Sequence, residues 1–228
     1  MSPFFLFKFM NTLQNIKICG ITQPHTARFV AGHGIGAVGF IFYSRSPRFI
    51  TPDHACLLSR EIKPYNTASV GVFADAPLEE VIKTAEIVNL STIQLHGNET
   101  AEYAQTLADI GYRVIKVLKT AGAILIDQAS RIPADIGIMV EAGNGSLPGG
   151  NGALWNWEAV YELSKIRQIA IAGGITPDNI MKAAANSGAA ALDVSSGVED
   201  KPGIKNHDKI SELIKNTSGL SRSVQFWK

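Results

Sequence analysis

The chain alternates strand-like and helix-like segments along its whole length, and this alternation limits its fold more than any other feature. The eight predicted strands are short runs rich in Val, Ile and Ala, which is typical of strands buried on both faces. They cover residues 15–19, 37–42, 69–73, 92–96, 113–118, 136–141, 168–172 and 190–194. The predicted helices cover residues 24–32, 51–62, 77–88, 99–110, 121–129, 157–166, 177–186 and 208–215.

Regular alternation with short links predicts parallel strands, because parallel neighbours need a crossover connection. Local signals support the helices: Thr51 is a predicted N-cap, with Pro52 in the first helical position. Eight such units that close on themselves form an α/β fold, the (β/α)8 or TIM barrel. The structural alternative is a doubly wound open sheet, which usually begins with a GxGxxG turn after the first strand, and that turn is absent here.

The 228 residues fit one barrel domain, predicted over residues 15–216. Residues 1–14 form a predicted N-terminal leader. Its apolar start is too short to cross a bilayer and lacks the basic region and cleavage site of a signal peptide. Residues 217–228 form a C-terminal tail with an aromatic and basic end, for which packing under the barrel and disorder both remain open.

The formal net charge of +1 gives no electrostatic footprint for nucleic acid or for an acidic membrane surface. Cys19 and Cys56 are far apart, so they predict neither a disulfide framework nor a CxxC zinc site. Two reduced thiols indicate a cytoplasmic protein. No histidines and carboxylates have the spacing of metal ligands, so we expect no metal.

Barrel enzymes carry their active sites at the C-terminal ends of the strands. Cys19 ends the first predicted strand, His96 the fourth and Glu141 the sixth. Cys19 is either a buried small hydrophobe or a base that must be a thiolate to act. Glu141 is either a rim residue paired with a lysine or a general acid, and His96 is either a core histidine or a pocket residue.

Two further signals point to a phosphorylated, carboxylated ligand. Arg48 follows the second strand, where arginine can bind a carboxylate bidentately, although most loop arginines are simply solvated; Arg45 is a weaker candidate. The loops after the seventh and eighth strands are small and glycine-rich, as in phosphate-binding loops of this barrel. They contain Gly173, Gly174, Ser195, Ser196 and Gly197, with Asp193 at the strand end.

These residues lie in segments that resemble phosphoribosylanthranilate isomerase of tryptophan biosynthesis. The matching segments are KICGIT, GFIFYSRSPRFI, VGVF, IQLHGNE, PGGNG, AGGITPDNI and DVSSGVEDKPGIKNHDKI. The resemblance runs in order from about residue 15 to about residue 216. Other phosphate-binding barrels share the AGG loop but not the whole set.

The resemblance implies an Amadori rearrangement of N-(5-phosphoribosyl)anthranilate to 1-(2-carboxyphenylamino)-1-deoxyribulose 5-phosphate. It implies that Cys19 is the base, that Arg48 holds the anthranilate end, and that no cofactor is needed. The glycines and serines of the last two loops would hold the phosphate, with Asp193 and His96 beside the substrate. The implied partner is a small-molecule phosphosugar, with neither nucleic acid nor membrane, and the chain is expected to be a monomer or a weak homodimer.

The chain departs from the family in one region. Glu141 stands where the family usually has an aspartate as general acid, so the reach of the carboxylate differs by one methylene. Asn151 interrupts the usual GG[ST]G, and Asn156 replaces an acidic residue. If Glu141 were not the acid, Asp135 or Asp193 would be the next candidates.

Two other functions remain open at this stage. A non-catalytic phosphosugar-binding barrel would bind the ligand without turnover, and the presence of Cys19 and a carboxylate at Glu141 argues against it. A related isomerase, such as the histidine-pathway analogue, acts on a substrate with two phosphates, uses two aspartates and lacks the KICGIT cysteine.

Overall fold

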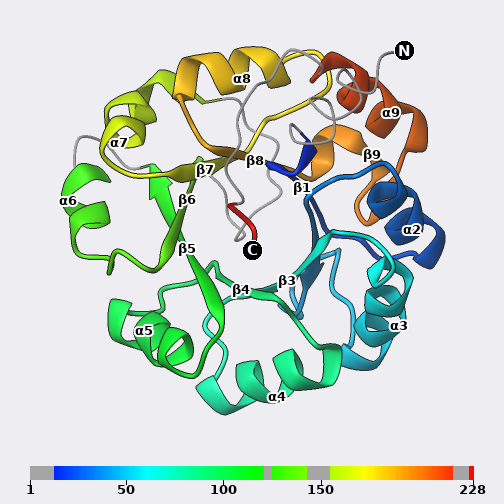
Figure 1. Ribbon diagram of the computed structural model, residues 1–228, viewed down its shortest axis with the longest axis horizontal. Helices are drawn as coiled ribbons and strands as arrows, with labels where there is room; N and C mark the ends of the chain where they lie inside the picture. The colour runs from blue at the N-terminus through cyan, green and yellow to red at the C-terminus, as the bar shows by residue number, and fades with distance from the viewer. Residues whose placement is uncertain (1–12, 121–124, 143–154, 218–225) are drawn as a thin grey trace.

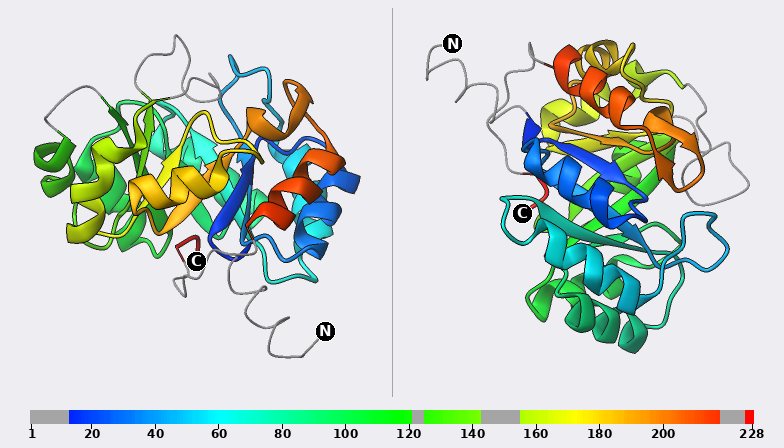
Figure 2. Two further views of the ribbon diagram at one scale, coloured as in Figure 1. Left: turned by 90° about the horizontal axis from the view of Figure 1, so that it is seen from above. Right: turned by 90° about the vertical axis from the view of Figure 1, so that its right-hand side faces the viewer.

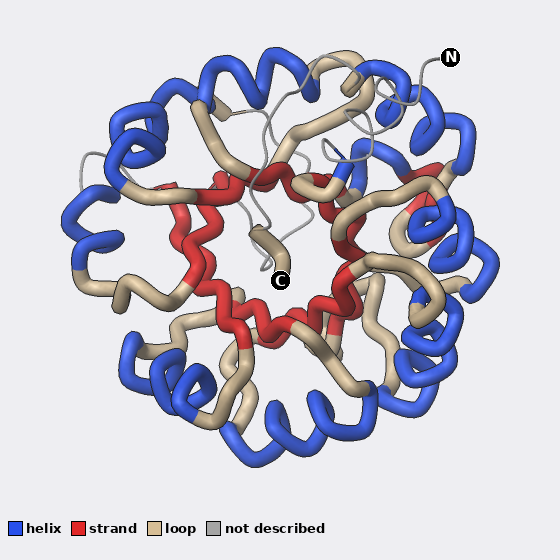
Figure 3. Tube along the Cα trace, in the orientation of Figure 1, coloured by secondary structure: helices blue, strands red, loops and turns tan. Residues whose placement is uncertain are grey.

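A computed structural model describes residues 13–120, 125–142, 155–217 and 226–228. Eight parallel strands form a closed barrel in sequence order, and β1 pairs with both β2 and β8. Figures 1 and 3 show this ring of strands inside a ring of helices. The strands are β1 (Ile16–Cys19), β2 (Ala37–Ile41), β3 (Ala68–Phe73), β4 (Thr92–Leu95), β5 (Arg113–Thr120), β6 (Gly137–Ala142), β7 (Ile169–Ala172) and β8 (Ala191–Val194). The (β/α)8 prediction is confirmed, and the closure excludes the open sheet.

Helices cover the outside of the barrel in the predicted order. They are α2 (Pro24–Gly32), α3 (Pro52–Ile62), α4 (Leu78–Val88), α5 (Ala101–Asp109), α6 (Leu125–Ser130), α7 (Tyr161–Ile166), α8 (Ile180–Ser187) and α9 (His207–Asn216), with the 3-10 helix η2 (Trp157–Val160) before α7. Thr51 caps α3 as predicted, since its side chain accepts a hydrogen bond from the backbone of His54. The first residues of the helix predicted over 121–129 lie outside the described residues.

Two helices begin later than predicted, because polar side chains bond the preceding turn. Helix α5 begins after Thr100, whose hydroxyl accepts from the backbone of Tyr103. Before α8, Asn179 accepts a hydrogen bond from the backbone of Thr176 and donates one to the carbonyl of Gly174. Asn179 therefore belongs to the β7–α8 loop rather than to the helix.

A small hairpin after β8 was not predicted. It consists of β9 (Glu199–Lys201) and β10 (Ile204–Lys205), which pair antiparallel. Gly203 allows the tight turn between them, because its φ of 81° lies in the left-handed region. The hairpin carries Glu199 and Lys205, and it lies on the side of the barrel opposite to the chain's C-terminus (Figure 2).

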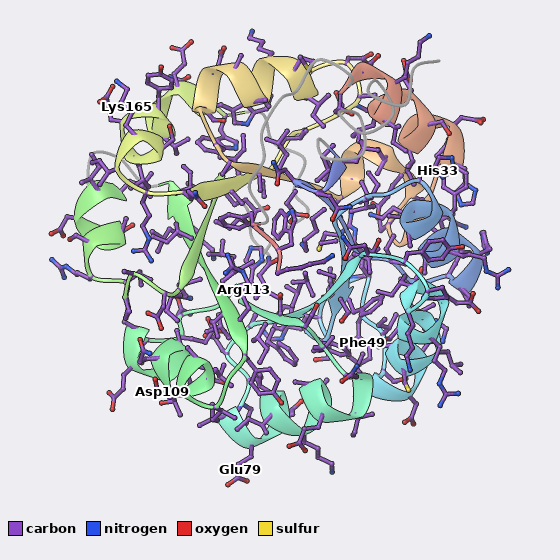
Figure 4. All side chains as sticks on the ribbon, in the orientation of Figure 1. His33, Phe49, Glu79, Asp109, Arg113 and Lys165 are labelled. Carbon is purple, nitrogen blue, oxygen red and sulfur yellow. The ribbon has the colours of Figure 1, made fainter. Side chains whose placement is uncertain are left out.

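The apolar core lies between the strands and the helices, and charged side chains such as Glu79, Asp109 and Lys165 point outward from the helices (Figure 4). A second buried cluster fills the lower interior of the barrel and includes Phe226 and Trp227 of the tail. For Phe226 and Trp227, this burial corresponds to packing under the barrel, one of the two possibilities given for the tail. No helix within the described ranges has the length and apolar character to span a bilayer.

Candidate active site

A pocket lies at the C-terminal ends of the strands. Parallel strands all end at this rim, which is why residues from distant parts of the sequence meet there. Its walls include most of the predicted site residues: Cys19, Arg48, His96, Glu141, Gly173, Gly174, Asp193, Ser195 and Ser196. Gly197 lies behind this surface, and a Cβ atom there would be 1.9 Å from the carbonyl oxygen of Ile175. Glycine at this position therefore lets the 3-10 helix η3 (Ser196–Val198) approach the β7–α8 loop.

Cys19 lies at the end of β1 and is 6% exposed. Burial raises the pKa of its thiol, and the charge of Asp193 acts in the same direction. Two ammonium groups, those of Lys17 and Lys205, act against this and favour the thiolate. A thiolate at neutral pH needs a neighbouring cation or a helix N-terminus that lowers the thiol pKa. The structure supplies two cations, but desolvation outweighs them in the ligand-free pocket.

Lys17 was missed as a site residue, and it lies directly below the thiol. Its Nζ donates to Oδ2 of Asp193 at 3.0 Å, and its side chain is fully buried. Burial alone would lower the pKa of Lys17, but the charges of Asp193 and Cys19 raise it, so the ammonium stays charged. The sequence did contain a signal for Lys17: it precedes Cys19 by two residues in a buried strand, and side chains at positions i and i+2 of a strand lie on the same face.

Asp193 has one paired oxygen and one unpaired oxygen. Oδ2 accepts from Lys17, whereas buried Oδ1 has no hydrogen-bond partner among the described residues. Burial raises the pKa of this carboxyl, and Glu141 adds to the effect while Lys17 opposes it. Buried polar atoms are normally paired, so Oδ1 is a natural acceptor for a ligand hydroxyl.

His96 and Glu141 form the second functional pair in the pocket. The Nε2 atom of His96 donates to Oε2 of Glu141 at 2.7 Å, and both side chains are buried. Gln94 donates to Nδ1 of the same ring at 3.2 Å, which fixes the ring between its two neighbours. Glu141 is therefore paired with a histidine of the same pocket.

Arg48 is buried and paired rather than solvated. Its Nε and Nη2 atoms donate to the carboxylate of Glu199 at 2.9 and 2.7 Å. Lys205 donates to Oε1 of the same carboxylate at 2.7 Å, the oxygen that also accepts from Nε of Arg48. It also donates to the carbonyl and hydroxyl of Ser195. Ser195 in turn donates to the carbonyl of Cys19 at 3.0 Å. Glu199 and Lys205 were missed because the hairpin that carries them was not predicted.

The glycine loops form the remaining wall of the pocket. Gly173 and Gly174 have φ angles of 90° and 70°, a region that glycine adopts at no steric cost. A Cβ at Gly173 would be 3.3 Å from Nε1 of Trp155 and 3.4 Å from Cγ of Glu141. Together with Ser195 and Ser196, these backbones form a cradle in which backbone N–H groups can approach an anion.

Other sequence candidates lie elsewhere. Arg45 is exposed and lies outside the pocket wall. Asp135 accepts from Gln105 on the outer surface. Asn156 caps η2 by accepting from the backbone of Glu158.

The altered PGGNG segment, residues 148–152, lies outside the described residues. A search of the described part of the chain finds no group of three His, Cys, Asp or Glu side chains that could hold a metal ion.

Most of the chain is similar to known proteins. A model of the family N-(5'phosphoribosyl)anthranilate (PRA) isomerase matches residues 16–216. The N-(5'-phosphoribosyl)anthranilate isomerase of Geotalea uraniireducens (strain Rf4) is 35% identical over 208 residues, covering 91% of this chain and 100% of the relative. The protein of that name from Trichlorobacter lovleyi is 37% identical over 202 residues, covering 88% and 96%.

Solved structures agree with these relatives. The crystal structure of phosphoribosyl anthranilate isomerase from Thermotoga maritima is 34% identical, with a TM-score of 0.82 over 90% of this chain and 99% of the other. A phosphoribosyl anthranilate isomerase in complex with reduced 1-(o-carboxyphenylamino)-1-deoxyribulose 5-phosphate is 33% identical, with a TM-score of 0.80 over the same shares. The chain belongs to the N-(5'-phosphoribosyl)anthranilate isomerase family.

Proposed function

We propose that this chain is an intramolecular oxidoreductase that isomerises N-(5'-phosphoribosyl)anthranilate to 1-(2-carboxyphenylamino)-1-deoxyribulose 5-phosphate in tryptophan biosynthesis. One observation carries the proposal beyond family membership. A thiol (Cys19), a carboxyl paired with an imidazole (Glu141 and His96) and a glycine cradle line a single pocket. These are the parts that ring opening, proton abstraction and phosphate binding need.

Glu141 acts as the general acid in the first step. Its carboxyl protonates the ring oxygen of the ribose, and the C1–O bond breaks to give an open chain with a protonated Schiff base. The hydrogen bond from His96 holds the Glu141 carboxyl in one orientation, which a general acid needs for efficient transfer. This pairing supports the assignment although the side chain is one methylene longer than aspartate.

Cys19 acts as the base in the second step. Its thiolate removes the proton at C2, and the electrons move into the iminium to give an enolamine, which tautomerises to the ketone. The iminium is its own electron sink, so the chemistry calls for neither metal nor nucleotide. Its positive charge next to Cys19 adds to that of Lys17 and Lys205 and favours the thiolate when substrate is bound.

The two ends of the substrate bind different groups of the pocket. The phosphate lies against Gly173, Gly174, Ser195 and Ser196, beside the ammonium of Lys205. The anthranilate carboxylate binds Arg48 through the edge of the guanidinium that does not face Glu199. Gly197 keeps the cradle compact.

A hydroxyl of the sugar donates to Oδ1 of Asp193, which is otherwise unpaired among the described residues. This contact would fix the sugar next to the Cys19 thiol. The acceptor therefore contributes to orientation of the substrate rather than to proton transfer.

The remaining expectations belong to the same proposal. The enzyme works in the cytoplasm as a monomer or weak homodimer on a small-molecule phosphosugar. A related structure, of monomers generated from the dimeric isomerase of Thermotoga maritima, is 31% identical. Sedimentation of the purified chain at micromolar and millimolar concentrations would test the assembly.

Complementation of a tryptophan auxotroph that lacks this isomerase tests the function. The unmutated chain should restore growth, whereas Cys19→Ala and Glu141→Ala should not. In parallel, the purified chain should convert phosphoribosylanthranilate without added metal or nucleotide. Soluble chain that neither complements nor turns over the substrate, but still binds it, would establish the non-catalytic phosphosugar-binding alternative instead.

A further inference from the structure

The last three residues of the chain return to the floor of the barrel, at the N-terminal ends of the strands. Phe226 and Trp227 are 2% and 1% exposed, and the C-terminus lies in the middle of the strand ring when seen down the barrel axis (Figure 1). A perpendicular view places it at the face opposite to the β9–β10 hairpin (Figure 2). The family match ends at residue 216, so this element lies outside it.

The barrel floor is built to receive these two rings. Six of the ten other residues in the apolar cluster around them are alanines of the strands or next to a strand: Ala37, Ala68, Ala170, Ala172, Ala190 and Ala191. Such side chains leave space in the lower barrel that larger residues usually fill. Phe226 and Trp227 fill it and pack edge to face, with ring centroids 5.0 Å apart.

Hydrogen bonds hold the tail in this position. The hydroxyl of Thr92 in β4 donates to the carbonyl of Trp227 at 2.8 Å, and Nε of Arg113 in β5 donates to the carbonyl of Phe226 at 2.9 Å. Lys228 donates to the carbonyl of Asn66 at 2.7 Å. Figure 4 shows Arg113 toward the inside of the barrel, in contrast to the charged residues of the helices. The tail is therefore anchored to two strands and to the β2–β3 side of the barrel.

The indole of Trp227 lies next to the charged layer of the active site. The Nζ of Lys17 is 5.7 Å from the centre of the Trp227 ring, within the range of a cation–π interaction. The same Nζ is bonded to Asp193, and the charges of both groups act on the Cys19 thiol. The floor residue thus contacts the cation that favours the thiolate.

We infer that Trp227 is a positioning residue, which holds the Lys17 ammonium from below against Asp193 and Cys19 and so supports proton abstraction by the thiol. This inference rests on the proposed function for its catalytic consequence, but the geometry can be tested without substrate. In a desolvated site the face of an indole is the best aromatic partner for an ammonium. Without the indole, the Lys17 ammonium can move toward the barrel floor, and water can weaken the electrostatic effect of this ammonium on the thiol.

Other charged groups also face this layer. They are Asp193 from β8, Lys205 from β10, Glu141 from β6 and His96 from the end of β4. Of these groups, Asp193 is the one that bonds Lys17 directly, whereas Trp227 contacts the ammonium through its ring. Replacing Trp227 therefore leaves these groups in place and changes only the lower neighbour of the ammonium.

The experiment measures the rate of alkylation of Cys19 by iodoacetamide against pH, in a full-length Cys56→Ser background so that only one thiol reacts. The matched pair is Trp227→Leu, which fills the floor without a ring, and Trp227→Phe, which keeps a ring face. We expect alkylation at pH 7 to slow about threefold in the leucine variant, equivalent to about 0.65 kcal/mol, because the thiol ionises at higher pH. Trp227→Phe should restore most of the rate.

Ile115→Ala is the control for a loss of stability alone, since Ile115 belongs to the same buried cluster but lies on β5. It should lower the melting temperature without changing the pH dependence of alkylation. The inference would be overturned if the pH dependence of alkylation were identical in Trp227→Leu, Trp227→Phe and the Trp227 parent. It would also be overturned if Ile115→Ala shifted that pH dependence as much as Trp227→Leu does. If the parent protein lacks turnover but the alkylation profile of Trp227→Leu is still shifted to higher pH, the proposed function fails and the positioning role stands.

With turnover as the second readout, Trp227→Leu should lower kcat and leave KM nearly unchanged, because Trp227 lies at the end of the barrel opposite to the substrate pocket. An increase in KM without a change in kcat would contradict the positioning role.

Discussion

The imidazole of His96 donates from Nε2 to Oε2 of Glu141 at 2.7 Å, and each of the two residues is 6% exposed. This contact ties the end of β4 to the end of β6 across the mouth of the barrel. It makes the position of the Glu141 carboxyl depend on a partner as well as on its own length. The hydrogen bond therefore holds the carboxyl of the longer glutamate in one orientation.

The first prediction concerns the Glu141 carboxyl. Glu141→Ala and Glu141→Gln should each lower kcat by about 10²–10⁴-fold, the range for loss of a general acid. Glu141→Asp should remain active, because it keeps the ionisable group, although its shorter reach should weaken the contact with His96. Steady-state kinetics at several pH values would check this order. Near-normal kcat in Glu141→Ala would move the role of acid to another group.

The second prediction concerns the anthranilate end of the pocket. Arg48→Lys keeps the charge but loses the planar fork that Glu199 and a substrate carboxylate can share. We expect KM to rise about tenfold, because a charge-assisted hydrogen bond contributes about 1.5 kcal/mol or more, with a smaller change in kcat. Binding of inorganic phosphate, which has no carboxylate, serves as the control and should be nearly unchanged. A decrease in kcat at constant KM would place Arg48 in the chemistry instead.

The fold was predictable because the barrel repeats one local pattern. Strand composition and turn positions depend on neighbouring residues, so the order of elements and the strand ends that carry Cys19, His96 and Glu141 followed from the sequence. Helix starts were less accurate where a side chain such as Asn179 bonds a loop instead of continuing the helix.

Long-range pairs were not predictable in the same way. Arg48 and Glu199 are 151 positions apart, and Lys17 and Asp193 are 176 apart. No local pattern encodes such partners. Trp227 likewise gave no sign that it fills a space left by alanines on four different strands, because that space exists only after the barrel closes.

The third prediction concerns stability in acid. Burial opposes the charge of Glu199, but Arg48 and Lys205 hold the pKa of its carboxyl below the ordinary value. A carboxyl whose pKa is lower in the folded state contributes stability above its unfolded pKa, and that contribution is lost as the pH falls through the folded pKa. Glu199→Gln removes the partner of two buried cations, so we expect it to lower the free energy of unfolding by about 3 kcal/mol near pH 7.

The difference between Glu199→Gln and the unmutated chain should shrink as the pH is lowered from about 6 to about 3, where the Glu199 carboxylate becomes protonated. Urea unfolding at a series of pH values measures this directly. A constant difference over the whole range would mean that the charge of Glu199 does not stabilise the fold.

The last prediction concerns the pH dependence of the reaction. The base must be a thiolate, and burial raises the pKa of Cys19 in the free enzyme despite the opposing charges of Lys17 and Lys205. A raised pKa moves the acidic limb of kcat/KM to higher pH, so kcat/KM should rise from about pH 6 and keep rising above the ordinary pKa of a free thiol. Lys205→Met removes one of the cations that favour the thiolate and should move this limb further toward alkaline pH.

Cys56→Ser is the matched control for that profile, because Cys56 lies on helix α3 outside the substrate pocket and should leave the limb in place. Cys19→Ser should abolish the limb together with most of the activity, since a hydroxyl ionises far above the pH range of the assay. The acidic limb of kcat, which reports the substrate complex, should fall at lower pH than the acidic limb of kcat/KM. The reason is that the iminium adds a positive charge beside the thiol. If the kcat/KM limb lay below the ordinary thiol range and Lys205→Met did not move it, Cys19 would not be the group that titrates.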